Sequence, residues 1–257
     1  MDLQIRNKVI LVTGGAQGIG AAIVRGAAQE GAIPVIVDKN ALAAEQLRSE
    51  LHVRCHVIHA DLCNARNCAD TVVETIRIFG QIDALVNNAG VNDRVGLEAG
   101  SPAEYVESLE RNLVHYFNMA HYALPSLKES HGCIVNVSSK TAVTGQTGTS
   151  GYVSAKGAIL ALTREWAADL LPWEIRVNAV VPAEVLTPHY LQWIDTFPDP
   201  EEKRKTIVSK IPLGKRMTTP DEIAAMVLFL VSSKAAHITG QHVFVDGGYV
   251  HLDRALT

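Results

Sequence analysis

Residues 8–20 read KVILVTGGAQGIG, a short apolar run that breaks into glycines and continues as the helix-like stretch IGAAIVRGAAQEG at 19–31. A strand, a glycine turn and a helix in that order typically begin a βαβ unit. Gly14, Gly18 and Gly20 remove side chains that would hold the backbone away from a phosphate, and the helix start offers unpaired N–H donors. The spacing Gly-x3-Gly-x-Gly matches the general G-x-G-x-x-G fingerprint only in part, so a merely tight turn is the competing interpretation.

The alternation of apolar runs and helical periods continues along the chain. Further β-branched runs stand at 33–38, 53–61, 82–90, 132–139, 174–183 and 242–248, and helical periods at 41–51, 67–79, 102–128, 151–171 and 220–232. Runs that are apolar on both faces need helices on both sides of their sheet. The pattern therefore predicts an α/β fold with a doubly wound parallel sheet, in a single domain over residues 1–257.

One stretch falls outside this alternation. Residues 182–219, which begin PAEVLTPHYLQWIDTFPDPEEK, are rich in Pro, Thr and aromatic side chains. Long irregular stretches in compact domains are usually functional or disordered. We predict that this stretch is an irregular lid over the functional site.

Composition restricts the partners of the chain. Its formal net charge is −4, 47% of its residues are hydrophobic, and it contains no block of Lys and Arg. Such a chain lacks the positive surface that nucleic acid or an anionic membrane requires. The N-terminus does not read as a signal peptide, and no run of about 18 apolar residues occurs. We expect a soluble, cytoplasmic protein that acts on a small molecule.

The cysteines and histidines predict neither a disulfide framework nor a metal site. The four cysteines, Cys55, Cys63, Cys68 and Cys133, include no CxxC pair, so we expect reduced, buried thiols. The segment HVRCHVIH at 52–59 places three histidines around Cys55, but side chains alternate between the two faces of a strand. These groups therefore do not converge on one ion.

Acidic residues end the two apolar runs that follow the glycine turn. Asp38 lies 18 residues after Gly20, where a carboxylate can accept hydrogen bonds from both ribose hydroxyls of an adenosine. Its charge repels a 2′-phosphate and so favours NAD; NADP is the alternative, because Lys39 offers a neighbouring cation. Asp61 ends the next run and is expected beside the adenine ring. A solvated strand end is the competing interpretation for both carboxylates.

A tyrosine and a lysine stand one helical turn apart in SGYVSAKGA, residues 150–158. Positions i and i+4 share a face of a helix, so Tyr152 and Lys156 reach the same surface. A fixed cation favours phenolate, and we expect Lys156 to lower the pKa of Tyr152 from about 10 and make it a general base. Ser139 ends a strand-like run 13 residues before Tyr152 and can donate a hydrogen bond to a substrate oxygen. By itself a Tyr-x3-Lys pair is common on helix surfaces.

These motifs occur together and in order. They are TGGAQGIG, Asp61, NNAG at 87–90, Asn112, Ser139, Tyr152 and Lys156, spread over most of the chain. In this combination the sequence resembles the short-chain dehydrogenase/reductase family. The resemblance implies a three-layer, Rossmann-like domain of about seven parallel strands, with a nicotinamide dinucleotide bound at the carboxyl ends of the strands. It also implies a catalytic tetrad, which falls on Asn112, Ser139, Tyr152 and Lys156.

The resemblance further implies which residues hold the cofactor. The family's nicotinamide-pocket segment, usually Pro-Gly followed shortly by Thr, falls on PAEVLTP at 182–188, where Ala183 replaces the glycine. The residues expected to bind NAD are Gly14, Gln17, Gly18, Ile19, Gly20, Asp38, Lys39, Asp61, Leu62, Asn88, Ala89, Gly90, Tyr152, Lys156, Pro182, Val185 and Thr187.

The expected reaction is the oxidation of an alcohol. Tyr152 takes the hydroxyl proton while hydride leaves the carbinol carbon for C4 of NAD, and Ser139 holds the oxygen on which charge develops. Lys156 also binds the nicotinamide ribose, and Asn112 holds a water that connects Lys156 with solvent. The cofactor supplies the hydride chemistry and the protein supplies orientation.

Polar and aromatic residues around the tetrad indicate the substrate. The candidates are Asn92, Asp93, Ser139, Lys140, Gln146, Tyr152, Glu184, His189, Tyr190, Trp193 and Arg254. Buried polar groups need partners, and a polyhydroxylated ring offers them at every carbon. NNAGVND, SSKTAVTGQ and VDGGYVHLDRALT are similar to segments of the family's bacterial L-fucose dehydrogenases, which implies oxidation of an aldose C1 hydroxyl to a lactone. The tail residues Asp253 and Arg254 are expected to complete the pocket, in the same or a neighbouring subunit.

Two other functions remain open at this stage. A hydroxysteroid or other secondary-alcohol dehydrogenase would share the tetrad but would need a less polar pocket. A dinucleotide-sensing protein without catalysis would not need Tyr152 beside Lys156. The period at 151–171 has more apolar surface than one sheet face covers, and the family commonly pairs this helix across a twofold axis. A homotetramer is therefore expected.

Overall fold

Each of the seven apolar runs forms a strand in the computed structural model, which describes residues 2–253. The strands are β1 (Val9–Thr13), β2 (Ile33–Asp38), β3 (His56–His59), β4 (Ala84–Asn87), β5 (Cys133–Val137), β6 (Arg176–Pro182) and β7 (His242–Val245). All neighbouring strands are parallel, in the order β3-β2-β1-β4-β5-β6-β7. The predicted doubly wound sheet of one α/β domain is confirmed.

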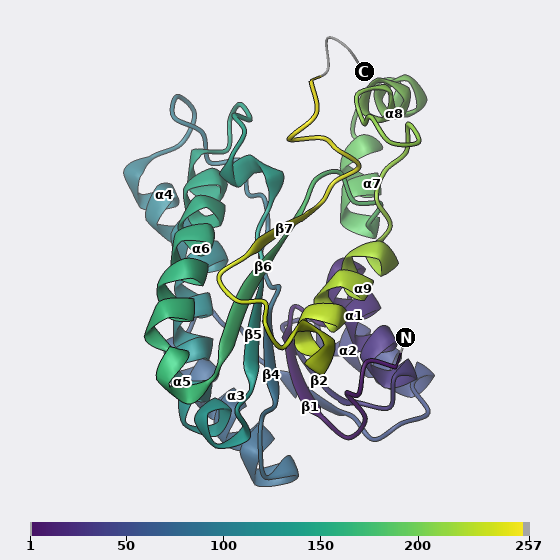
Figure 1. Cartoon of the computed structure of the whole chain (residues 1–257). Coiled ribbons are helices and arrows are strands. Elements are labelled where there is room, and N and C mark those ends of the chain that lie inside the picture. Colours follow the sequence, from purple (N-terminus) through teal and green to yellow (C-terminus); the bar gives the residue numbers. More distant parts are fainter. Residues whose placement is uncertain (1, 254–257) are drawn as a thin grey trace.

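Helices cover both faces of the sheet (Figure 1). They are α1 (Gly18–Gln29), α2 (Ala41–Glu50), α3 (Ala65–Phe79), α4 (Pro102–Leu109), α5 (His115–Ser130), α6 (Ser150–Asp169), α7 (Pro188–Ile194), α8 (Pro200–Ser209) and α9 (Pro220–Val231). Alternate residues of β1 enter different cores: Ile10 and Val12 pack with α1, α2 and α9, and Val9 and Leu11 pack with α3, α5 and α6. This alternation confirms the three layers.

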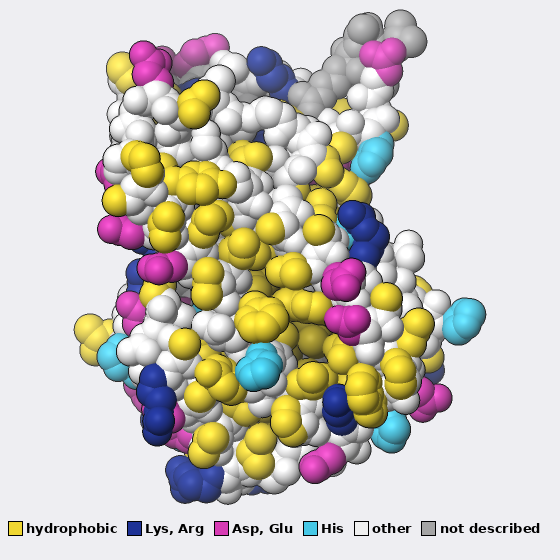
Figure 2. Space-filling model, turned by 90° about the vertical axis from the view of Figure 1, so that its left-hand side faces the viewer, with side chains coloured by type: hydrophobic (Ala, Val, Ile, Leu, Met, Phe, Trp, Pro, Cys, Tyr) yellow, Lys and Arg dark blue, Asp and Glu magenta, His cyan; other side chains and the backbone are white. Residues whose placement is uncertain are grey.

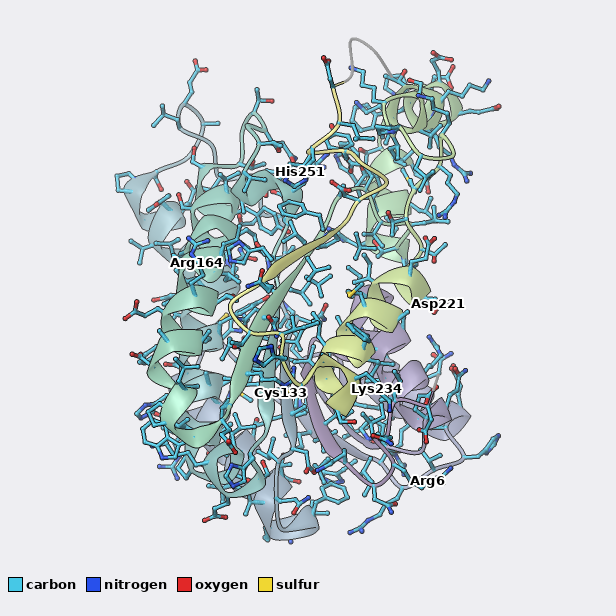
Figure 3. All side chains as sticks on the ribbon, in the orientation of Figure 1. Arg6, Cys133, Arg164, Asp221, Lys234 and His251 are labelled. Carbon is cyan, nitrogen blue, oxygen red and sulfur yellow. The ribbon has the colours of Figure 1, made fainter. Side chains whose placement is uncertain are left out.

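The chain reverses its direction across the sheet between β1 and β4, which are neighbours although β2 and β3 lie between them in sequence. At such a switch point the loops after the two strands diverge and leave a crevice at the carboxyl ends. Figure 3 shows this end at the top, where His251 follows β7, whereas Cys133, the first residue of β5, lies low in the molecule.

The helical period at 102–128 is not one continuous α-helix. Between α4 and α5 the backbone makes a π-helical turn at Glu110–Val114. Such turns insert a residue into a helix and are frequent at functional sites. This turn contains Asn112, one of the predicted catalytic residues.

The stretch at 182–219 was predicted to be irregular, and this part of the prediction is wrong. It holds the two short helices α7 and α8. Thr187 caps α7 by accepting from the Tyr190 N–H, Asp199 caps α8 by accepting from the Glu202 N–H, and a proline follows each cap. These are ordinary helix-start signals. A small apolar cluster that includes Ile194, Ile211 and Met217 packs the stretch together.

All four cysteines are free thiols, as predicted, but their burial differs from the prediction. Cys68 and Cys133 are buried, Cys55 is partly buried and Cys63 is exposed. Within residues 2–253, no group of three His, Cys, Asp or Glu side chains could hold a metal ion. No helix in this described range is both long and apolar enough to cross a bilayer.

Candidate active site

A cleft of about 1470 Å³ opens at the carboxyl ends of the strands. Nearly all the residues predicted for cofactor and substrate binding line it. The exceptions are Gly20 and Asn112, which lie behind its wall, Asp93 and Asp253, which lie outside it, and Arg254, which is outside the described residues.

The turn between β1 and α1 is built for close approach of a ligand backbone. Gly14 has φ +60° and Gly18 has φ +55°, which L side chains rarely adopt. A Cβ on Gly20 would lie 1.9 Å from the Gly14 carbonyl oxygen. At the start of α1, Gln17 makes no capping hydrogen bond through its side chain, so the first N–H groups face the cleft without a side-chain cap. This arrangement fits a pyrophosphate at the helix dipole.

The adenosine end of the cleft carries two fixed carboxylates. Asp38 accepts hydrogen bonds from the Ala16 N–H (3.0 Å) and the Asn40 N–H (2.9 Å), which hold it at the end of β2. Asp61 accepts from the Cys63 N–H (3.1 Å), and this bond lowers the pKa of its carboxyl group. Both groups line the cleft. They can receive ribose and adenine donors.

Asn112 is fully buried and acts through its neighbours. Its amide oxygen accepts from the Val91 N–H (2.7 Å), and its amide nitrogen donates to the Ser108 carbonyl (3.0 Å). A Cβ on Gly90 would lie 3.0 Å from the Asn112 Oδ1 and 3.4 Å from the Lys156 Nζ. Only a glycine therefore leaves this space between the cleft, the amide and the ammonium open.

Lys156 lies on the inner face of α6 and is 3% exposed. Its Nζ donates to the Tyr116 hydroxyl (3.0 Å) and to the Val137 carbonyl (2.9 Å), and lies 5.6 Å from the centre of the Tyr152 ring. Burial lowers the pKa of Lys156 to about 7. Tyr116, which the sequence did not single out, is thus a direct partner of the lysine.

The structure does not bear out the expected effect of Lys156 on Tyr152. Burial raises the pKa of Tyr152 to about 12, and a hydrogen bond with Ser139 lowers it only in part. The reason is that removal from water disfavours both charged forms, the phenolate and the ammonium. Ser139 itself is held by Thr141, whose N–H (3.3 Å) and hydroxyl (3.1 Å) donate to the Ser139 Oγ.

A charged cluster forms the wall beyond Ser139. The Lys140 ammonium pairs with the Glu184 carboxylate, and the Tyr190 hydroxyl donates to the other oxygen of Glu184. The Lys140 Nζ also lies 3.8 Å from the centre of the Tyr249 ring. The sequence prediction included Lys140, Glu184 and Tyr190 but missed Tyr249. The available signal was the pair Gly247–Gly248, with φ +63° and +79°, which turns the chain back after β7.

One residue predicted for the substrate site lies elsewhere, and two residues that line the cleft were not predicted. Asp93 does not reach the cleft, because its carboxylate accepts from the Ser108 hydroxyl (2.8 Å) and from Arg111 (3.2 Å). Arg94 lines the cleft and lies 5.9 Å from the centre of the Trp193 ring. His115 also lines it, and burial lowers the pKa of its imidazole to about 4, so it is neutral.

The glycine turn and the switch point define the chain as a dinucleotide-binding α/β protein. The sequence model of a family described as enoyl-(acyl carrier protein) reductase matches residues 14–250. L-fucose dehydrogenase of Bos taurus is 35% identical over 249 residues, which are 96% of this chain and 91% of that protein. The chain belongs to the short-chain dehydrogenase/reductase family, whose members are NAD(P)-dependent oxidoreductases, and it is similar to L-fucose dehydrogenases within it.

Other relatives agree on the fold but differ in the substrates that their names state. Cyclopentanol dehydrogenase of Comamonas testosteroni is 34% identical over 250 residues, 96% of this chain and 98% of that protein. The crystal structure of Cj0485 dehydrogenase has a TM-score of 0.96 at 45% identity and covers 100% of this chain and 99% of that one. The ligand-free structure of Thermoplasma acidophilum aldohexose dehydrogenase has a TM-score of 0.89 at 30% identity, with coverage of 97% and 96%.

Proposed function

We propose that the chain is an NAD-dependent dehydrogenase that oxidises the C1 hydroxyl of an aldose, such as L-fucose, to the lactone. The observation that carries this proposal is that Ser139, Tyr152 and Lys156 share one cleft with the ion pair Lys140–Glu184. A polar wall beside the reacting groups suits a substrate with a hydroxyl on every carbon. The similarity to an L-fucose dehydrogenase and to an aldohexose dehydrogenase supports the same class.

In this proposal Tyr152 is the general base and Ser139 holds the substrate oxygen. With a pKa of about 12, Tyr152 is too weakly acidic to act at neutral pH without further positive charge nearby. Oxidised NAD, when bound, brings both that charge and the C4 atom that accepts hydride. Lys156 keeps a donor beside the phenol and would bind the nicotinamide ribose, and Asn112 holds the backbone at Val91.

Asp38 supports the preference for NAD. Two backbone N–H groups fix its carboxylate at the end of β2, where the adenosine ribose is expected. A 2′-phosphate at this place would meet a fixed negative charge. Lys39 lines the same part of the cleft and is exposed, so its cation can turn to solvent.

A plain secondary alcohol is the second candidate substrate. The similarity to cyclopentanol dehydrogenase favours it, because that relative matches nearly as well as the L-fucose dehydrogenase. A hydroxysteroid belongs to the same group of candidates. These substrates would leave the Lys140–Glu184 pair without a hydroxyl partner, which disfavours them.

Initial rates of NADH or NADPH formation test the proposal. The panel is L-fucose, D-arabinose, L-galactose, D-glucose, cyclopentanol and estradiol, each with NAD and with NADP. We expect the highest kcat/KM with an aldose, and NAD favoured over NADP by about 10-fold or more. A preference for cyclopentanol or estradiol would establish the second candidate. Tight NADH binding without turnover of any alcohol would instead indicate a dinucleotide-sensing protein.

We further propose a homotetramer in the cytoplasm. Exposed apolar side chains gather on and just before α5: Val114 ends the π-helical turn, and Phe117 and Tyr122 belong to α5. Figure 2 shows hydrophobic side chains gathered on this side of the molecule. Apolar patches of this kind mark protein interfaces. The four free thiols fit a reducing compartment.

A further inference from the structure

The cluster beside Ser139 joins four separate segments of the chain. Lys140 directly follows Ser139, Glu184 lies between β6 and α7, Tyr190 belongs to α7, and Tyr249 follows β7. The Lys140 side chain is 10% exposed and the Glu184 side chain 13% exposed, and both line the cleft. Stability alone does not explain a nearly buried ion pair, because apolar residues of similar volume are often at least as stabilising.

The hydrogen-bonding capacity of the pair is only partly used. An ammonium has three donors and a carboxylate has about four acceptor sites. Within the described part of the chain, Lys140 uses one of its donors on one oxygen of Glu184. Tyr190 donates to the other oxygen. The pair therefore offers a donor and an acceptor side by side at the surface of the cleft.

An alcohol hydroxyl is the small group that both donates and accepts a hydrogen bond. It can accept from Lys140 while it donates to Glu184. A carboxylate or phosphate would be repelled by Glu184, and an ammonium would be repelled by Lys140. A bare methylene would cover the pair without using its remaining donors and acceptor sites, which is less favourable than a hydroxyl that uses both.

We infer that the Lys140–Glu184 pair recognises the hydroxyl on the carbon next to the one that is oxidised, so that the site selects a vicinal diol. We infer this position because Lys140 directly follows Ser139 and both line the same cleft with Glu184. Ser139 holds the reacting oxygen in the proposed function, on which this inference rests. For an aldose oxidised at C1, the recognised group is the C2 hydroxyl. Tyr190 orients the carboxylate by donating to its second oxygen.

Two pairs of substrates test this inference. The first pair is L-fucose and 2-deoxy-L-fucose, and the second is cyclohexane-1,2-diol and cyclohexanol, which does not depend on the substrate being a sugar. The enzymes are the wild type, Glu184→Gln, and the double variant Lys140→Met/Glu184→Gln, which removes both charges in case a lone buried ammonium prevents folding. Glu201→Gln is the control, because Glu201 pairs with Lys205 (3.1 Å) on the exposed surface of α8.

In the wild type we expect kcat/KM to favour the vicinal diol over its deoxy partner by about 10- to 100-fold, as hydrogen bonds to charged groups do. The ratio should fall several-fold in Glu184→Gln, fall to within about 3-fold of one in the double variant, and stay unchanged in Glu201→Gln. The affinity of the NADH-loaded enzyme for L-fucose, measured by calorimetry, should weaken in parallel. The affinity for NADH should stay unchanged, which distinguishes this effect from a loss of folding.

The outcomes separate this inference from the proposed function. If aldoses are oxidised but the ratio is equal in the wild type and Glu184→Gln, the inference is wrong and the proposed function stands. If no aldose is oxidised but the diol preference depends on Glu184, the inference holds and the substrate class is corrected. A wild type that prefers cyclohexanol to the diol overturns the inference outright.

Discussion

Tyr152 and Lys156 share one face of α6, where Lys156 is buried and Tyr152 is partly buried. The lysine donates to Tyr116 and Val137 rather than to the Tyr152 hydroxyl, and Ser139 is the group that hydrogen-bonds with the Tyr152 phenol. The cation and the phenol are therefore neighbours, with the ammonium 5.6 Å from the centre of the ring. Any effect of the ammonium on the phenol is therefore electrostatic and acts across this distance.

The variant Tyr152→Phe should lower kcat by about 10²- to 10⁴-fold, because it removes the proposed base and keeps the ring. The dissociation constant for NADH, measured by fluorescence titration, should change by less than about 3-fold. Tyr105→Phe is the matched control, since Tyr105 lies partly exposed on α4. A near-normal kcat in Tyr152→Phe would contradict the assignment.

The buried lysine also predicts a pH dependence of stability. Folding lowers the pKa of Lys156 from 10.5 to about 7, so between these pH values the unfolded chain binds a proton that the folded chain does not. The free energy of unfolding should therefore rise with pH in this window, by at most about 1.4 kcal/mol per unit from this group. Below pH 7 both states hold the proton and the contribution is constant.

Urea unfolding of the wild type and of Lys156→Met at pH 7, 8 and 9 measures this contribution. The pKa of Tyr152 is about 12 in the folded chain and 10 otherwise, so Tyr152 does not titrate in this range. We expect the wild-type free energy of unfolding to rise more steeply than that of the variant, by about 1 kcal/mol per pH unit. Parallel slopes would show that Lys156 keeps its proton on folding.

At the scale of elements, the turn between β1 and α1 depends on one close approach. A Cβ at Gly20 would lie 1.9 Å from the Gly14 carbonyl oxygen, so Gly20→Ala must open the turn. We expect a loss of about 1–3 kcal/mol in stability and at least about 10-fold weaker NADH binding. Gly145→Ala, where a new Cβ meets nothing within 4 Å, should change stability by less than about 0.5 kcal/mol. Equal effects of the two substitutions would contradict this account of the turn.

The strands could be predicted from the sequence because they are apolar on both faces, and β1, β4 and β5 are buried at every residue. The π-helical turn at Glu110–Val114 could not, since one extra residue hardly changes the apolar period of the helix around it. The helices α7 and α8 were missed although Thr-Pro and Asp-Pro mark their starts. α7 is only 7 residues long, and α8 has no buried residue, so neither shows a clear apolar period.

The candidate site was likewise only partly predictable from the sequence. The glycine turn and the residues of the predicted tetrad have spacings that can be recognised in the sequence, and the structure places Ser139, Tyr152 and Lys156 in one cleft. The contact of Tyr249 with Lys140 depends on how the chain turns after β7, which spacing does not show. The raised pKa of Tyr152 depends on burial, which is a property of the folded chain.

At the scale of the whole molecule, the helices on the two faces of the sheet differ in how much apolar surface they expose. α1 and α9 pack against each other on one face, whereas on the other face α5 turns apolar side chains outward (Figures 1 and 2). Phe117 is 53% exposed and stacks on His121 at 5.8 Å between ring centres. An exposed apolar patch on a helical face is well suited to a second copy of the same face, since a twofold contact is self-complementary.

The proposed twofold contact can be tested by mutation. Phe117→Asp places a charge at the centre of the proposed contact and should reduce the molar mass of the wild-type assembly by half or more, measured by size-exclusion chromatography with light scattering. Leu42→Asp is the control: Leu42 is 86% exposed on α2, which packs on the opposite face of the sheet, and its substitution should leave the mass unchanged. A monomeric wild type, or a Phe117→Asp variant of unchanged mass, would show that the outer face of α5 does not join subunits. Because the predicted catalytic residues Tyr152 and Lys156 lie on α6, on the same face of the sheet as α5, dissociation should also lower kcat, and restoring the mass at high protein concentration should restore it.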